Sequence, residues 1–288
     1  MEFLIMQSFY GFSYGALLFI LSCGFTLIFG VMKFVNMAHA SFYLLGGYAA
    51  ITLLRWMGCT TASFILSIIV AAFTIGLLGV FIQRVFCRGL FGQDLPQVLL
   101  TLGFALLFDD VVLVVWGGDP LNVAVPEWLK GTLITGGYHF SIYRFFMIST
   151  AIIVALGLWL LLEKTSFGAK IRATADDEEM AGGVGIKIPL VSAGVFGLAA
   201  ALAAVAGVVG GGFLSLYPGA GLIMIPLAVA VVIIGGLGSI KGAAAASLLL
   251  GLIDSFGKAY LPEFAYFTMY LPMVIILAVK PTGLFGRA

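Results

Sequence analysis

Long apolar runs recur along the chain and are separated by short polar segments. A membrane-spanning helix needs about 20 mostly apolar residues, and most of the runs reach or approach that length. The pattern predicts nine candidate spans, which lie at 4–32, 34–55, 60–83, 95–116, 142–162, 189–214, 222–238, 243–257 and 265–279. The seventh and eighth are short and interrupted by glycine, so the alternative is a broken or re-entrant pair and eight spans in total.

The composition indicates that lipid is the solvent for much of this chain. Hydrophobic residues make up 62% of the 288 positions and charged residues 9%, whereas a soluble domain carries about 25% charged residues. We therefore expect an all-α, polytopic transmembrane helical bundle that forms a single domain over residues 1–288. The net charge of +1 gives no indication of a nucleic-acid partner. The three cysteines are scattered, so neither disulfides nor a metal site is predicted.

Basic residues are distributed unevenly between the loops. When the segment 163–188 is placed in the cytoplasm, the fourteen Lys and Arg residues fall on that side except Arg55, Lys130, Arg144 and Lys258. Cytoplasmic loops of membrane proteins carry an excess of Lys and Arg. The distribution therefore predicts a multi-pass protein with its N-terminus outside and its C-terminus in the cytoplasm.

The segment 117–141 is the longest loop on the predicted outer side. It contains Trp128 and Tyr138 as well as two prolines. Trp and Tyr are enriched at the boundary between membrane and water, so we expect this loop to lie at the interface.

The inner segment 163–188 has the features of a short, capped helix. Thr174 followed by Asp177 predicts a helix N-cap, and acidic residues fill the next turn, where they suit the helix dipole. Gly182, Gly183 and Gly185 would end this helix. A rigid helix here could carry the movement of a cytoplasmic partner into the bilayer, and the alternative is a solvated, charged loop.

The stretch that joins the first two apolar runs is unusually polar and contains Lys33, Asn36 and His39. Unpaired polar groups are costly in hydrocarbon, so these side chains should face protein, water or the headgroup boundary. Asn36 and His39 are three residues apart and are expected on one helix face. One interpretation is a break or gate in the translocation path, and the other is an interfacial turn with a snorkelling Lys33. The path candidates are Asn36, His39, Ser41 and Ser239.

Asp109 and Asp110 stand inside the fourth apolar run. Acidic residues within the membrane are often functional, so one hypothesis is an ion-coupled secondary transporter that uses these two residues. Neighbouring positions on a helix point about 100° apart, so the two carboxylates should face different surroundings. A location near the outer boundary, where they are protonated or hydrogen-bonded, is the other interpretation.

The sequence contains neither a GxxxxGK[ST] nucleotide-binding motif nor a catalytic constellation of Ser, His or paired Asp residues. We therefore expect no enzymatic activity and no cofactor in this chain, and any ATP that is used would be bound by another chain. A weak internal repeat relates residues 28–46 to residues 233–251. Repeated halves with glycine-broken helices are a common transporter design.

Four glycine-containing motifs occur along the chain: GFTLIFGVMKFVNMAH at 24–39, RATADDEEMAGGVGI at 172–186, GGLGSIKGA at 235–243 and KPTGLFGR at 280–287. In this order they resemble the permease subunits of branched-chain amino acid ABC importers, specifically the LivH type, over nearly the whole chain. Within the second motif, Glu179-x-Ala181-xxx-Gly185 is similar to the E-A-A-x3-G signature of importer permeases.

The resemblance implies a permease of the bacterial inner membrane that forms a heterodimer with a second, related permease subunit. Two cytoplasmic ATPase subunits would drive it, and a periplasmic or surface-tethered solute-binding protein would deliver the solute, which would pass inward between the permeases. The resemblance also implies that residues 173–185 dock on an ATPase. The coupling residues would be Arg172, Asp177, Glu179, Ala181 and Gly185.

The sequence departs from the family pattern at several positions. Ala40 follows His39 where glycine is usual, and Lys241 stands where proline is usual. Asp109 and Asp110 replace positions expected to be neutral and polar. These differences concern the expected translocation path. The solute could therefore be a branched-chain amino acid, or instead urea, a short amide or an aromatic acid.

Overall fold

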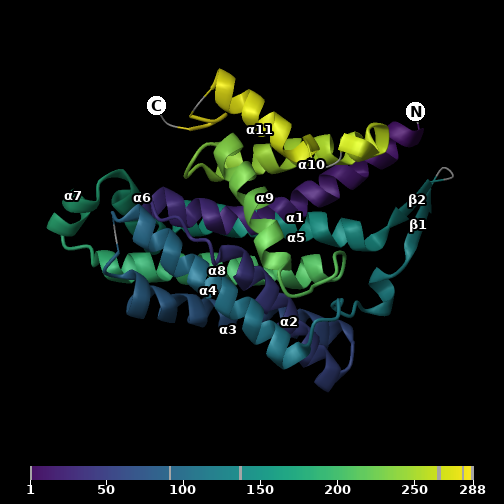
Figure 1. Ribbon diagram of the computed structural model, residues 1–288, viewed down its shortest axis with the longest axis horizontal. Coiled ribbons are helices and arrows are strands. Elements are labelled where there is room, and N and C mark those ends of the chain that lie inside the picture. The colour runs from purple at the N-terminus through teal and green to yellow at the C-terminus, as the bar shows by residue number, and fades with distance from the viewer. Residues whose placement is uncertain (1, 91, 136–137, 265–266, 281, 287–288) are drawn as a thin grey trace.

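The computed structural model describes residues 2–90, 92–135, 138–264, 267–280 and 282–286. Within these ranges the chain forms a helical bundle with one short β-hairpin (Figure 1). The elements in order are α1 (Glu2–Met32), α2 (His39–Met57), α3 (Thr61–Ile82) with a π-helical extension (Gln83–Cys87), α4 (Asp94–Trp116), a 3-10 turn (Glu127–Leu129), β1 (Thr132–Thr135), β2 (Tyr138–Ser141), α5 (Ile142–Lys164), α6 (Ser166–Asp176), α7 (Glu178–Gly183), α8 (Ile188–Gly211), α9 (Ala220–Gly235), α10 (Ile240–Tyr260), a 3-10 turn (Pro262–Phe264) and α11 (Phe267–Val279).

The all-α, polytopic architecture predicted from the apolar runs is confirmed. Each run overlaps a helix in the described ranges, and six helices are long and apolar enough to cross a membrane, namely α1, α3, α4, α5, α8 and α10. The eighth run, expected to be short, extends over Ile240–Tyr260 as α10. The helix is longer than the apolar run because it continues through Lys241 and Lys258, where the hydrophobic pattern stops.

Helix α8 lies at the centre of the bundle, packed against α1, α2 and α3. Its many alanines and glycines allow neighbouring backbones to approach closely. A Cβ atom at Gly207 would collide with the backbone of Tyr43 on α2, and one at Gly197 would collide with the side chain of Val80 on α3. Lipid supplies little hydrophobic driving force between helices, so close packing of this kind is what holds them together.

Helices α1 and α10 form a second tight, antiparallel pair. The Ser255 hydroxyl donates to the Gln7 carbonyl over 2.9 Å, and the Gln7 side-chain amide donates to the Ser255 carbonyl. A Cβ atom at Gly251 would lie 2.5 Å from the backbone nitrogen of Gly15. The start of α1 and the end of α10 therefore lie at the same end of the bundle.

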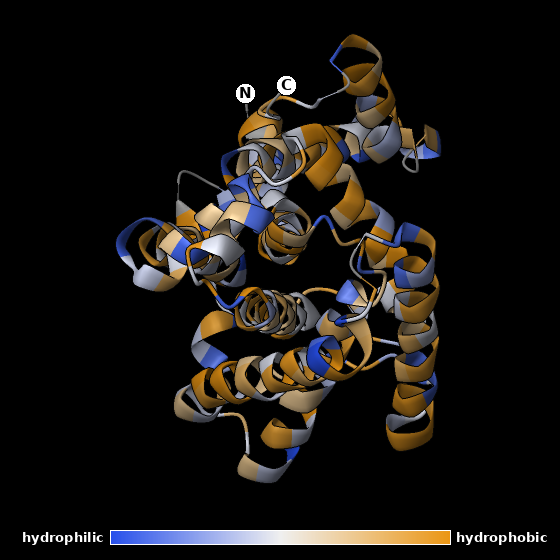
Figure 2. Cartoon of the chain, turned by 90° about the vertical axis from the view of Figure 1, so that its left-hand side faces the viewer, coloured by the Kyte–Doolittle hydropathy of each residue, from blue (hydrophilic) through white to orange (hydrophobic). Residues whose placement is uncertain are grey.

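Figure 1 shows the hairpin β1–β2 and the helix α7 at opposite ends of the long axis. The N-terminus lies at the hairpin end and the C-terminus lies towards the α7 end. Viewed from the α7 end, the helices are coloured mostly as hydrophobic residues (Figure 2). The outer faces of α3, α4 and α5 carry exposed aliphatic and aromatic side chains, as expected of helices that meet lipid or other subunits.

The loop 117–141 contains more regular structure than its composition predicts. Its strands β1 and β2 pair antiparallel, with Thr132 opposite Ser141. Earlier in the same loop, Leu121 forms an isolated β-bridge with Leu216, which lies in the loop after α8. The sequence of β1, Thr-Leu-Ile-Thr, does not alternate between apolar and polar residues, and the Leu121 bridge joins residues far apart in the sequence.

Candidate functional site

The break between α1 and α2 reverses the chain inside the bundle. After Met32 ends α1, Lys33 adopts a φ of 47°, which is uncommon for a residue other than glycine. The chain then runs back along α1, because the Nε2 atom of His39 lies 2.8 Å from the carbonyl oxygen of Leu21. Leu21 stands roughly three turns, or about 16 Å, before the end of α1. Helix α2 therefore begins beside the middle of α1.

Three of the predicted path residues, Asn36, His39 and Ser41, are buried at this break. The side-chain oxygen of Asn36 accepts the backbone N–H of Ala38 at 3.0 Å. Its Nδ2 atom, the Nδ1 atom of His39 and the hydroxyl of Ser41 have no hydrogen-bond partner in the described part of the chain. Buried polar groups are normally bonded, so the break concentrates unused hydrogen-bonding capacity inside the bundle.

The expectation that Asn36 and His39 share a helix face is wrong. Helix α2 begins at His39, and Asn36 stands in the turn that precedes it. The bond from Ala38 to the Asn36 side chain explains this, because a local contact of that kind competes with helical hydrogen bonding. A turn with an exposed Lys33 therefore separates α1 from α2, and the role of this turn in a translocation path stays a prediction.

Two residues outside the predicted set, Gly24 and Thr101, shape the break. A Cβ atom at Gly24 would lie 2.8 Å from the Ala199 carbonyl oxygen and 3.0 Å from a ring carbon of His39. The Thr101 hydroxyl on α4 accepts the backbone N–H of Met37 at 3.0 Å. Gly24 belongs to the first motif, so the sequence held a signal for it. Thr101 lies 64 positions from its partner, and no local pattern reveals that contact.

Helices α2 and α9 begin side by side within the bundle. A Cβ atom at Gly221, in the first turn of α9, would lie 3.2 Å from the carbonyl oxygen of Ala40. The N-termini of helices carry partial positive charge, and many transporters place the ends of broken helices at their binding sites. Ser239 lies elsewhere, because it caps α10 by accepting the N–H of Gly242 at 3.1 Å. The structure therefore groups three of the four path candidates.

Three of the four sequence motifs meet in space. A Cβ atom at Gly30 in the first motif would lie 2.8 Å from the Cα atom of Gly238 in the third. In the fourth motif, Phe285 donates its backbone N–H to the carbonyl of Gly235 at 3.1 Å. The second motif, in α6 and α7, lies at the same end of the molecule as the C-terminus (Figure 1). Motifs spread over the whole chain are thus gathered towards one end of the bundle.

The inner segment folds into two short helices, α6 and α7, which project from that end; we call residues 165–186 the elbow (Figure 1). The N-cap expected at Thr174 is wrong, because Thr174 lies within α6 and its hydroxyl bonds to the Lys170 carbonyl at 2.9 Å. Asp177 is the cap instead, and its side chain accepts the N–H of Met180 at 2.9 Å. The hydroxyl of Thr165 caps α6 earlier in the chain, so a helix has already formed when Thr174 is reached.

The C-terminal end of α7 explains the glycine at position 185. Gly185 has a φ of 89°, and its N–H bonds to the Gly182 carbonyl at 3.0 Å while Ile186 reaches back to the Ala181 carbonyl at 3.1 Å. This is the Schellman arrangement, in which glycine is preferred. Ala181 is buried, and Glu179 is exposed in the first turn, where its charge suits the helix dipole. The signature therefore combines an acidic first turn, a buried anchor and a helix cap.

Arg172 connects the elbow to the end of α5. Its guanidinium lies 3.7 Å from the Glu163 carboxylate, and both side chains are about half exposed. An exposed ion pair of this kind contributes at most about 1 kcal/mol, so this contact adds little to the stability of the fold.

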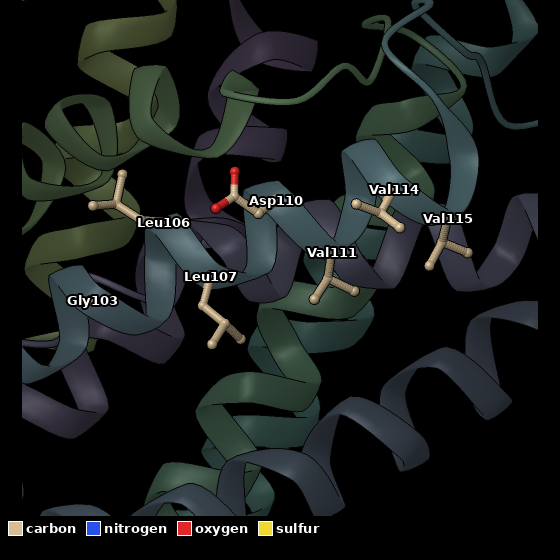
Figure 3. A pocket seen from close by; sticks show the side chains of 7 residues that line it. All are labelled: Gly103, Leu106, Leu107, Asp110, Val111, Val114 and Val115. Atoms are coloured by element: carbon tan, nitrogen blue, oxygen red, sulfur yellow. The ribbon is translucent and has the colours of Figure 1, made fainter.

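The two aspartates of α4 face different surroundings, as their spacing predicted. Asp109 is buried, and its Oδ1 atom has no hydrogen-bond partner in the described part of the chain. Asp110 is exposed and is one of the residues that line a shallow hollow on the outer surface of α4 (Figure 3). The two carboxylates therefore do not form a single site within this chain.

Arg144, near the start of α5, is a further polar residue of interest. Its guanidinium lies 4.2 Å from the ring centre of Tyr10 and 4.7 Å from that of Phe213. It also donates to the Ser13 hydroxyl at 2.6 Å. Aromatic rings rather than a carboxylate thus hold this cation. The sequence predicted only the side of the membrane on which Arg144 lies, because its ring partners come from α1 and from the turn after α8, both distant in sequence.

Comparison with known proteins agrees with the motifs. Residues 7–279 match the profile of a family described as "Branched-chain amino acid transport system / permease component". The chain belongs to this family. The high-affinity branched-chain amino acid permease protein BraD of Pseudomonas aeruginosa is 30% identical over 96% of this chain and 94% of that protein. LivH of Escherichia coli, described in the same way, is 30% identical over 99% of this chain and 96% of that protein.

A more distant match is LsrC of Yersinia enterocolitica, named as a permease protein of an autoinducer 2 import system. It is 33% identical over 56% of this chain and 45% of that protein. The family match, by contrast, spans the bundle from α1 to the end of α11. The LivH-type resemblance is therefore confirmed, and the chain is a multi-pass permease component of a transport system.

Proposed function

We propose that this chain is the translocating subunit of an ATP-driven importer for branched-chain amino acids or a related small solute. It would pair with a second, related permease, while two cytoplasmic ATPase subunits on separate chains bind and hydrolyse ATP. A periplasmic or surface-tethered binding protein would deliver the solute. Family membership supports the permease role, and the names of BraD and LivH supply the solute class.

The observation that carries the coupling proposal is the exposed apolar tip of the elbow. Met180 is 66% exposed and Val184 is 76% exposed, although the elbow projects beyond the apolar spans. Acidic residues from Asp177 to Glu179 surround this tip. Apolar side chains bordered by charged ones are typical of surfaces that dock another protein. We infer that an ATPase subunit covers Met180 and Val184.

The packing of the elbow supports its role as a lever. Phe167, at the start of α6, fills a notch on α8 at Gly194, where a Cβ atom would lie 2.6 Å from the Phe167 ring. A Cβ atom at Gly168 would collide with the carbonyl of Leu161 at the end of α5. Because α6 is seated on both helices, a displacement of α7 would reach α5 and α8 rather than being lost in a flexible loop.

Polar replacement of the elbow tip tests the coupling. In the double variant Met180→Ser/Val184→Ser, recovery of the ATPase subunits with this chain should fall by about tenfold or more, since a few apolar residues carry most of the binding energy of an interface. Leu133→Ser, at an apolar position of β1 that is 49% exposed, is the matched control and should leave recovery unchanged. Normal recovery and ATP-dependent uptake in the double variant would contradict the assignment.

The solute class can be tested on the binding protein of the same system. A ligand present at about 100 times its Kd stabilises the folded state by about 2.7 kcal/mol. Leucine, isoleucine and valine should each raise the Tm of the binding protein by several degrees, whereas urea, short amides and aromatic acids should not. A shift with one of those other compounds alone would reassign the solute while leaving the importer mechanism in place.

An ion-coupled secondary transporter remains a second candidate because Asp109 is a buried carboxylate with an unbonded oxygen in a spanning helix. Such a transporter would take up solute in vesicles that have a proton or sodium gradient and no ATP, and Asp109→Asn would abolish that uptake. Uptake that requires ATP and survives Asp109→Asn would exclude this candidate.

A further inference from the structure

Helix α4 has one covered face and one face that the rest of the chain leaves open. Its buried positions follow helical spacing and lie on the side that meets α2; they are Gln97, Thr101, Ala105, Phe108, Asp109 and Val112. On the opposite side, exposed apolar residues run from Leu95 to Val115, and Val114 is 84% exposed. In the membrane this open face must meet lipid, water or another protein.

The open face contains a shallow hollow of about 580 Å³, formed by five aliphatic side chains together with Gly103 and Asp110 (Figure 3). The carboxylate of Asp110 is the one charged group in its lining. The lining is therefore apolar enough for the interior of a membrane, except for the Asp110 carboxylate, which hydrocarbon does not solvate.

Asp110 argues against lipid as the occupant of this face. It lies six residues before the end of α4 at Trp116, or about 9 Å along the helix axis. Trp116 itself is fixed by a 2.9 Å hydrogen bond to the hydroxyl of Thr52. An aspartate side chain is too short to reach the headgroups from that depth, and charged groups facing hydrocarbon are rare and costly. The outward faces of α3 and α5 have no acidic residue between their first and last turns.

Gly103 lies two helical turns before Asp110, so the two residues share the open face. No heavy atom lies within 4 Å of where its Cβ atom would be, so packing within the described chain gives no reason for glycine. In a helix interior, glycine lowers the equilibrium constant for helix formation about fivefold relative to alanine. Small residues instead mark places where a helix of another subunit approaches closely in the membrane.

We propose that the α4 face formed by Gly103, Leu107, Asp110, Val111 and Val114 is the contact surface for the second, related permease subunit. The partner places a Lys, Arg or other hydrogen-bond donor against Asp110. Charge complementarity favours a related chain over a second copy of this one, because α4 contains no Lys, Arg or His from Asp94 to Trp116. A symmetric α4–α4 contact would therefore bring two carboxylates onto a surface without a cation. This proposal rests on the proposed importer function, because it requires that a second permease subunit exists.

Site-specific photocrosslinking tests the surface in the assembled complex. A benzophenone amino acid replaces Val114 on α4 or, as the matched control, Ile153 on the outward face of α5, which is 68% exposed. Membranes containing this chain, the second permease and the ATPase subunits are irradiated, and adducts are identified by mass spectrometry. Val114 should give an adduct with the second permease in at least about tenfold greater yield than Ile153, since only the α4 probe lies in an interface.

Every other adduct pattern overturns the proposal. An adduct between two copies of this chain would assign the face to a homodimer, and lipid adducts at both probes would show that the face meets the bilayer. Labelling of a cysteine at position 114 by a water-soluble maleimide in the assembled complex would show a water-filled path. Recovery of the ATPase subunits is measured in the same samples. If they are recovered without a permease adduct, this inference fails alone; if they are absent, the proposed function fails.

The charge of Asp110 is tested separately. Asp110→Asn keeps the side-chain size but removes the charge, so recovery of the second permease should fall by about tenfold, whereas Asp110→Glu should retain most of it. Equal recovery in both variants would show that the carboxylate has no cationic partner.

Discussion

The glycines at the helix break and at the end of α7 are each required by the local structure, but for different reasons. Gly24 is small because both the Ala199 carbonyl and the His39 ring occupy the space beside it. Gly185 is needed for a different reason, since its φ of 89° ends α7 in a conformation that other residues adopt at a cost. The same amino acid therefore serves close packing in the membrane and backbone geometry in the elbow.

Gly24→Ala should destabilise the bundle by about 1–3 kcal/mol, because the added methyl group overpacks the contact between α1, α8 and His39. Gly157→Ala on α5 is the matched control, since no atom lies within 4 Å of its Cβ position. The control should be neutral or stabilising by up to about 1 kcal/mol. Thermal unfolding in detergent compares the two variants, and equal stability would contradict the packing at Gly24.

Gly185→Ala should destabilise the end of α7 by about 1–2 kcal/mol, the cost of a left-handed backbone for an L-residue. Gly183→Ala is the control, because Gly183 lies in α7 without a positive φ and with open space around it. Hydrogen exchange of the backbone amides from 178 to 186 should quicken by about tenfold in the first variant only. Unchanged protection in Gly185→Ala would show that the cap contributes nothing.

Helices α2 and α9 distinguish this fold from a bundle in which every helix runs from one end to the other. Both begin inside the molecule rather than at its ends, and their first turns touch at Ala40 and Gly221. The turn before α2 is held in place from α4 through the bond of the Met37 N–H to the Thr101 hydroxyl. The break that concentrates Asn36, His39 and Ser41 thus depends on a helix that is distant in sequence.

Thr101→Val should destabilise the protein by about 0.5–2 kcal/mol, the range measured for hydrogen bonds between membrane helices. The replacement has nearly the same shape and leaves the N–H of Met37 without its acceptor. Thr150→Val is the matched control because its hydroxyl bonds only within α5, to the Phe146 carbonyl. A solute-uptake assay should show a larger loss for the Thr101 variant, and identical behaviour of the two variants would disprove the role of this bond.

The whole molecule is organised along one long axis with chemically different ends. The elbow and the C-terminal motif lie towards one end and the hairpin β1–β2 lies at the other (Figure 1). The excess of basic residues predicts that the elbow end is cytoplasmic, and docking of an ATPase requires the same orientation. This orientation is the largest structural expectation that the importer proposal adds to the family assignment.

Cysteine labelling measures that orientation directly. In a variant whose native residues Cys23, Cys59 and Cys87 are replaced, Leu133→Cys in β1 should react with a membrane-impermeant maleimide in intact cells. Val184→Cys in the elbow should react only after the membrane is made permeable. Both positions are exposed in the structure, so access across the membrane decides the result. The reverse pattern would place the elbow outside and exclude ATPase coupling through it.

Local physics was sufficient to predict much of this architecture. The apolar runs located the spans because a bilayer requires some 20 apolar residues with satisfied backbone groups, whatever their neighbours are. The elbow was predicted because acidic first turns and terminal glycines act within a few residues, although its cap was placed at Thr174 instead of Asp177. The orientation of the chain and the roles of the coupling residues stay predictions.

Tertiary structure decided the features that depend on contacts between distant residues. It moved the start of α2 to the middle of α1, separated Asn36 from the helix face of His39, and brought Thr101 to the break. It also distinguished Asp109, which the bundle buries, from Asp110, which it leaves exposed. The sequence by itself determined that this protein lives in the membrane, because burial in lipid follows from composition. Which polar groups meet inside it follows only from how the helices pack.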